Sequence, residues 1–191
     1  LMIDNQAVLR ETGELLLTDY GVSGVCVFQL SREAAPALAQ GRSVRLAVNF
    51  LPEIPSLLPW LDARICQLAP ASLLTLTTGV LPRLLAQTVI REARLSPDMP
   101  AEALSESEKQ ALCGALSAFP LVVTGTQGFA NAQVTRGGVS LADVDPSTMA
   151  SRLFDGLHII GELLDVDGPC GGYNLHFAFA GALAAAKAIA G

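Results

Sequence analysis

The first fifty residues carry the apolar and polar alternation that predicts β-structure. Four short segments show it: residues 8–10, 14–18, 25–30 and 43–50. Thr12-Gly13 is typical of a hairpin turn between the first two of these strands. Ser31 is a favourable N-cap and predicts a short helix that Gly41 ends. We therefore expect a small sheet with one helix between its later strands.

From residue 52 the pattern changes from alternating to leucine-rich with frequent prolines. Prolines punctuate residues 52–118 while β-branched residues become fewer, which predicts short helices joined by proline turns. Ser105 and Glu108 have the spacing of a capping box and predict a helix that runs to about Ser117. Residues 119–125 return to the strand pattern. The sequence therefore predicts a β-domain that a helical subdomain interrupts.

The last third is less regular and ends in a helix. The predicted elements are a strand at 132–135, a helical turn at 146–149, an apolar strand at 156–161, an acidic glycine-containing loop at 162–172 and a small-residue helix at 173–190.

Composition and charge narrow the class of protein. Hydrophobic residues make up 51% of the chain and charged residues 16%, which excludes an intrinsically disordered chain. No apolar run reaches the roughly 18 residues that a transmembrane helix needs, so we expect a soluble protein. A net charge of −6 without a basic cluster disfavours nucleic acid and anionic membrane as partners. Small molecules or proteins are the expected partners.

Cysteine spacing and hydropathy add two expectations. The four cysteines lie far apart and without nearby histidines, which favours reduced thiols in the cytoplasm over a zinc site or a disulfide framework. The mean hydropathy of +0.45 is high for a globular domain. It indicates apolar surface that meets protein outside this chain, although a leucine-rich core explains it nearly as well.

The loop before the final helix holds the residues with the clearest chemical potential. Glycines at a helix start let a flat ligand approach the backbone, and the free amides there stabilise negative charge, such as that on the N1 and O2 atoms of a reduced flavin. Glu162 follows the predicted apolar strand directly, where a carboxylate can accept a hydrogen bond from a ribose or ribityl hydroxyl. On spacing alone, a plain strand-to-helix connection with turn glycines is the somewhat favoured alternative.

Several segments together resemble one family, the BaiN/YhiN-type flavoproteins, also catalogued as the aminoacetone oxidase family. The matching segments are residues 13–24, 29–32, 49–53, 132–139, 148–151, 161–168 and 171–175. Their order and spacing agree over nearly the whole chain. Three positions depart from the family pattern: Ala150 and Arg152 stand where the family usually has Glu and Lys, and His176 stands where it more often has Gln.

The resemblance implies an FAD-dependent oxidoreductase with a mixed α and β fold. It implies a β-barrel-like insertion domain (residues 1–51 and 119–127), a small helical subdomain (52–118) and the C-terminal part of a two-dinucleotide-binding FAD domain (128–191). The family's N-terminal strand and Gly-rich dinucleotide fingerprint have no counterpart here, so the chain looks like a C-terminal half. FAD contacts would then come from eight residues: Gly161, Glu162, Asp167, Gly171, Gly172, Tyr173, Asn174 and Leu175.

The resemblance also implies the type of chemistry. Hydride would pass through flavin between a nicotinamide nucleotide and an organic, enone-like substrate, with no catalytic residue assigned and no metal site. The missing half of the FAD domain, or self-association, is the expected protein partner. Both histidines, His158 and His176, are predicted to be packed structural residues, and Cys170 is the thiol nearest the loop chemistry. The alternative is a non-catalytic binding module that keeps the fold without flavin.

Overall fold

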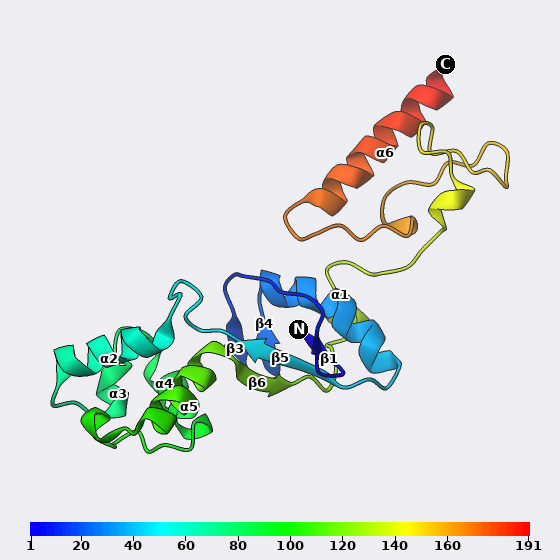
Figure 1. Ribbon diagram of the computed structural model, residues 1–191. Helices are drawn as coiled ribbons and strands as arrows, with labels where there is room; N and C mark the ends of the chain where they lie inside the picture. The colour runs from blue at the N-terminus through cyan, green and yellow to red at the C-terminus, as the bar shows by residue number, and fades with distance from the viewer. The chain divides into compact units, whose positions relative to one another are not determined.

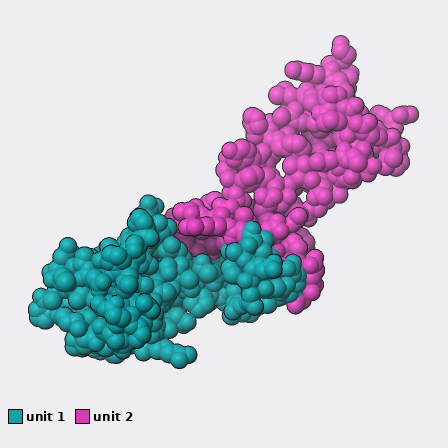
Figure 2. Space-filling model, viewed as in Figure 1, with its two compact units in different colours: residues 1–8, 42–124 teal, residues 9–41, 125–191 magenta.

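The computed structural model describes all 191 residues, which form two compact units (Figure 2). Unit 1 comprises residues 1–8 and 42–124, and unit 2 comprises residues 9–41 and 125–191. The chain therefore passes from one unit to the other three times. Each unit combines segments from more than one of the predicted domains, and the domain boundaries stay a prediction.

Unit 1 contains a four-stranded antiparallel sheet in the order β2-β1-β5-β6. Its strands are β1 (Met2–Ile3), β2 (Gln6–Ala7), β5 (Val44–Val48) and β6 (Phe119–Val122). Val44 and Leu46 are buried while Arg45 between them is exposed, which is the predicted alternation. Pro120 is tolerated because β6 lies at the sheet edge, where its missing N–H leaves no ladder bond broken. The pairing of β5 with β6 confirms that the chain returns to the sheet after the helical segment.

The helices of unit 1 confirm the prediction for residues 52–118 (Figure 1). They are α2 (Leu57–Leu68), α3 (Leu73–Leu76), α4 (Arg83–Glu92) and α5 (Glu106–Ser117), with the 3-10 turn η1 (Ala101–Ala103). The predicted capping box is present, because Ser105 Oγ accepts from Glu108 N and Glu108 Oε2 accepts from Ser105 N at 2.8 Å. Buried side chains from all four helices form one apolar core: Leu61, Leu73, Leu76, Val89, Ile90, Leu112 and Leu116.

Unit 2 contains a short hairpin, two long helices and much irregular chain. Its elements are β3 (Leu16–Thr18), β4 (Gly21–Ser23), α1 (Val25–Ala39), the 3-10 turns η2 (Phe129–Asn131), η3 (Leu141–Asp143) and η4 (Gly161–Leu163), and α6 (Tyr173–Ala190). The hairpin turn is Asp19-Tyr20, between β3 and β4, and not Thr12-Gly13 as predicted. The final helix is confirmed.

Residues 25–30 were predicted as a strand and are the first half of α1. Gly24 is the N-cap at φ +114° with no side-chain cap, and Phe28 N donates to its carbonyl at 3.0 Å. Ser31 therefore lies inside the helix, where its hydroxyl donates to Phe28 O, and it is not the N-cap. A Cβ on Gly24 would lie 2.3 Å from Glu14 O, so only glycine fits this junction.

The predicted strands at 8–10, 132–135 and 156–161 are also wrong. Outside the named strands this part of the chain pairs only through isolated bridges, such as Val139 with Leu164 and Ala150 with His158. A strand needs a continuous neighbour to satisfy its backbone N–H and C=O groups, and these segments pair at single residues at most. The mixed α and β class is confirmed, but the strands do not close into a barrel. No helix has both the length and the apolar character to cross a membrane.

Candidate functional site

The loop that leads into α6 has the backbone that the sequence predicts for a close ligand approach. Gly171 and Gly172 have φ values of +125° and +91°. Gly172 is the N-cap of α6 and brings no side chain to the first-turn amides. A Cβ on Gly172 would meet nothing within 4 Å, so the space beside this backbone is open. Exposed amides and the positive end of an 18-residue helix together favour an anionic or electron-rich ligand edge.

Asn174, in the first turn of α6, holds this loop by two hydrogen bonds of its side chain. Its Oδ1 accepts from Gly168 N at 2.7 Å, and its Nδ2 donates to Gly168 O at 3.1 Å. A Cβ on Gly168 would lie 3.2 Å from both Asn174 Oδ1 and Tyr173 Cβ, so the turn is tight as well as clasped. Both polar atoms of the Asn174 side chain therefore help to shape the loop, and its contact with FAD stays a prediction.

Helix α1 holds the same loop from the other side. Arg32 Nε donates to Asp167 Oδ2 at 2.8 Å, and Cys170 N donates to Gln29 Oε1 at 3.3 Å. The side chain of Asp167 is 18% exposed and that of Arg32 39%. One carboxylate oxygen of Asp167 is thus paired with the guanidinium group of Arg32.

Glu162 lies in η4 and faces a different segment. Its Oε1 accepts from the backbone N and the hydroxyl of Thr135, at 2.8 and 3.0 Å. These hydrogen bonds, the backbone one first, lower the pKa of Glu162 below its usual value. Asp165 similarly accepts from Gly137 N at 3.1 Å. Both carboxylates therefore stabilise the turn at residues 135–138.

The remaining predicted residues lie along α6. Gly161, at φ +64°, packs against this helix, because a Cβ there would be 3.4 Å from Ala178 Cβ. Tyr173 and Leu175 are exposed by 64% and 68%. Further down the helix, large apolar side chains are also exposed: Phe179, Leu183 and Ile189. The structure thus brings together Asp167, the glycine loop (residues 168–172) and Asn174, whereas Glu162 contacts the turn at residues 135–138.

Three polar residues at the site were not predicted individually: Gln29, Arg32 and Thr135. Arg32 meets Asp167 across 135 positions of sequence, a distance at which no local spacing rule applies. The only signal was their presence in segments that carry the family resemblance. Of the two histidines, His158 is half-buried with Nδ1 2.9 Å from Thr148 O, as a structural residue would be. His176 is exposed, so it is not a packed residue.

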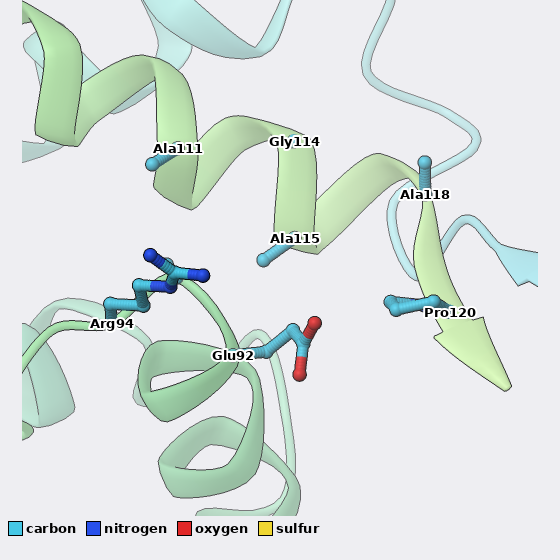
Figure 3. A pocket seen from close by; sticks show the side chains of 8 residues that line it. Glu92, Arg94, Ala111, Gly114, Ala115, Ala118 and Pro120 are labelled. Atoms are coloured by element: carbon cyan, nitrogen blue, oxygen red, sulfur yellow. The ribbon is translucent and has the colours of Figure 1, made fainter.

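A pocket of about 350 Å³ lies in unit 1, between the end of α4, helix α5 and β6 (Figure 3). Small residues of α5 form one wall, and Glu92 and Arg94 stand opposite. It contains none of the predicted site residues.

Comparison with known proteins identifies the class to which this chain belongs. Residues 1–134 match the family described as "HI0933-like protein barrel and H2TH domain". Together with the relatives below, this match shows that the chain belongs to the BaiN/YhiN-type flavoproteins that its sequence resembles.

Among its relatives is the 3-dehydro-bile acid delta(4,6)-reductase of Clostridium scindens, 36% identical over 191 residues, which are 99% of this chain and 47% of that protein. Two ribosomal RNA dihydrouridine synthases are also similar. That of Escherichia coli (strain K12) is 33% identical over 96% of this chain and 44% of its own length. That of Haemophilus influenzae is 30% identical over 92% of this chain and 42% of its own length. The chain therefore spans about half the length of the curated relatives it matches.

Proposed function

We propose that this chain is the C-terminal half of an FAD-dependent oxidoreductase that reduces a carbon–carbon double bond conjugated to a carbonyl group. The observation that carries the proposal is the loop at Gly171 and Gly172, where positive φ values and open space expose the first-turn amides of α6. The similarity to a bile acid reductase over 99% of this chain supports the same reaction class.

The residues of the loop fit one edge of a flavin. A flat ring can lie against the Cα of Gly172 because no side chain occupies that space. The amides at the start of α6 would donate to the pyrimidine edge and stabilise its negative charge on reduction. Leu175 and Tyr173, both exposed, would cover apolar parts of the ring system.

In this proposal Glu162 has one carboxylate oxygen available for the cofactor. Glu162 uses only Oε1 for Thr135, so its Oε2 would accept a hydrogen bond from a ribityl hydroxyl. Gly161 allows the close packing of η4 on α6 that sets the position of Glu162. When bound, FAD would accept hydride from a nicotinamide nucleotide and deliver it to the substrate, while this chain binds and orients the ring.

The substrate class follows from the relatives and the charge of the chain. A 3-dehydro-bile acid with delta(4,6) unsaturation and the uracil base that becomes dihydrouridine both carry a double bond conjugated to a carbonyl. The net charge of −6 opposes binding to an RNA backbone. We therefore favour a small enone or dienone. Uridine in ribosomal RNA is the second candidate, because two relatives act on it by name.

The test uses the complete protein that contains this chain. An absorption spectrum with flavin maxima, followed by bleaching under anaerobic NADH or NADPH, would support an FAD oxidoreductase. Reoxidation of the reduced protein by a steroid 4,6-dien-3-one, but not by ribosomal RNA from cells lacking dihydrouridine, would support the small-molecule substrate. The reverse preference would favour the RNA reaction. Folded protein that takes up no FAD would support the non-catalytic binding module instead.

A further inference from the structure

We infer that Gln29 and Arg32 of α1 are positioning residues that hold the glycine loop in its flavin-binding geometry. The inference rests on the proposed function and adds residues to it that lie outside the FAD-binding segment. Helix α1 follows the β3–β4 hairpin, whereas the loop precedes α6 at the other end of the sequence. Two side chains on one face of α1, three positions apart, connect these distant segments.

The two contacts act on different parts of the loop. Arg32 fixes the side chain of Asp167, which directly precedes Gly168. Gln29 accepts from the backbone N of Cys170, next to Gly171 and Gly172. Because these glycines lack side chains and have wide conformational freedom, their backbone geometry depends on neighbouring anchors. The Cys170 hydrogen bond is such an anchor on the α1 side.

The Asp167 ion pair is shielded from solvent on its carboxylate side. Asp167 is mostly shielded, and the Nε–Oδ2 distance of 2.8 Å is that of a charge-assisted hydrogen bond. Arg32 is itself held in the region by a second arginine, because Arg136 donates to the Arg32 carbonyl at 3.0 Å. The middle of α1, where Arg32 lies, is therefore connected both to Asp167 and to Arg136.

Asn174 alone cannot set the geometry of the double glycine. Its clasp joins residues 168 and 174 and makes no hydrogen bond to the residues between them. The contacts from α1 hold the chain at Asp167, before the clasp, and at Cys170, within it. In the proposed enzyme they would also couple the segment that carries the β3–β4 hairpin to the flavin edge.

The experiment compares matched variants of the complete protein. Arg32→Ala should weaken FAD binding roughly tenfold, the effect of losing one charge-assisted hydrogen bond, and Arg32→Lys should recover most of it. Gln29→Leu should weaken binding by about three- to tenfold, whereas Gln29→Glu keeps the acceptor and should stay within roughly twofold of wild type. Amide hydrogen exchange at Cys170 should accelerate in Gln29→Leu and not in Gln29→Glu.

The control is Arg42→Ala, which removes an exposed ion pair of similar length, Arg42 Nε to Asp4 Oδ2 at 2.7 Å, in unit 1. It should leave FAD affinity and the flavin spectrum unchanged. Wild-type affinity and spectrum in both Arg32→Ala and Gln29→Leu would overturn the inference while leaving the proposed function intact. A wild-type protein that binds no FAD would overturn the proposed function itself.

Discussion

Replacing Gly172 by Val tests whether the glycine loop contacts flavin. Gly172 has φ +91° and ψ −3°, a left-handed conformation that costs a β-branched residue about 1–2 kcal/mol. For a chain of this size that strain lowers Tm by roughly 2–8 °C. The added Cβ causes no clash within the chain, because it meets nothing within 4 Å. The unliganded variant should therefore fold.

The effect on FAD should be much larger than this strain. A flavin ring in van der Waals contact with the Gly172 Cα would be displaced by the new side chain and would lose hydrogen bonds from the amides at the start of α6. Losing two such bonds costs on the order of 3 kcal/mol, which corresponds to roughly a hundredfold weaker binding. Cys170→Ala, which removes only a small side chain, should have a smaller effect.

The assay is titration of apoprotein with FAD, followed by flavin fluorescence, with far-UV circular dichroism to verify folding. The matched control is Gly79→Val, because Gly79 has φ +76° and equally open space but lies in unit 1. Both variants should lose similar thermal stability, and only Gly172→Val should lose FAD. If folded Gly172→Val protein bound FAD as tightly as wild type, the glycine loop would be a turn and nothing more.

Four further predictions concern other parts of the chain. Glu162→Ala should weaken FAD binding by roughly ten- to a hundredfold, the effect of one charged hydrogen bond, and Asp165→Ala should do less; equal affinities by titration would remove the ribityl role. Ser105→Ala should lower the free energy of unfolding by about 1 kcal/mol in urea denaturation, because the capping box of α5 is lost. Hydrogen bonds from Ser105 lower the pKa of Glu108. The stability that the ionised Glu108 carboxylate contributes should therefore be complete above the usual pKa of 4.5 and should disappear as pH falls through the lowered pKa. A stability difference between wild type and Glu108→Gln that persists at lower pH would contradict this. The chain expressed alone should self-associate in analytical ultracentrifugation and bind little FAD, because α6 exposes a row of large apolar side chains; a stable yellow monomer would be the opposite result.

Local patterns predicted the elements whose signals are complete within a few residues. The capping box before α5 and the alternation in β5 are of this kind, and the structure confirms both. The start of α1 was missed because Gly24 caps it without a side chain, and the β-branched and aromatic residues that follow favour a strand by propensity. The apolar run at 156–161 was read as a strand although it has no partner strand in this chain.

In the candidate site, too, the sequence predicted local features but not the contacts between distant segments. The sequence singled out Gly171 and Gly172, and in the structure both have positive φ values. It did not predict that Asn174 clasps Gly168, that Glu162 is engaged by Thr135, or that α1 supplies Gln29 and Arg32. Each of these contacts depends on how distant segments pack, and residue type alone does not determine that.

The threefold passage of the chain between its two units also affects how the protein can fold during synthesis. Residues 9–41 leave the ribosome early, but their partners in unit 2 are residues 125–191, made only after all of residues 42–124. Unit 1 can close its sheet and helical core once β6 is complete, whereas α1 must wait for Asp167 and Cys170. Contacts of such high sequence separation form slowly, and the apolar face of α1 stays exposed meanwhile. The same connections that anchor the loop therefore make unit 2 the last part to fold and the part most in need of chaperones.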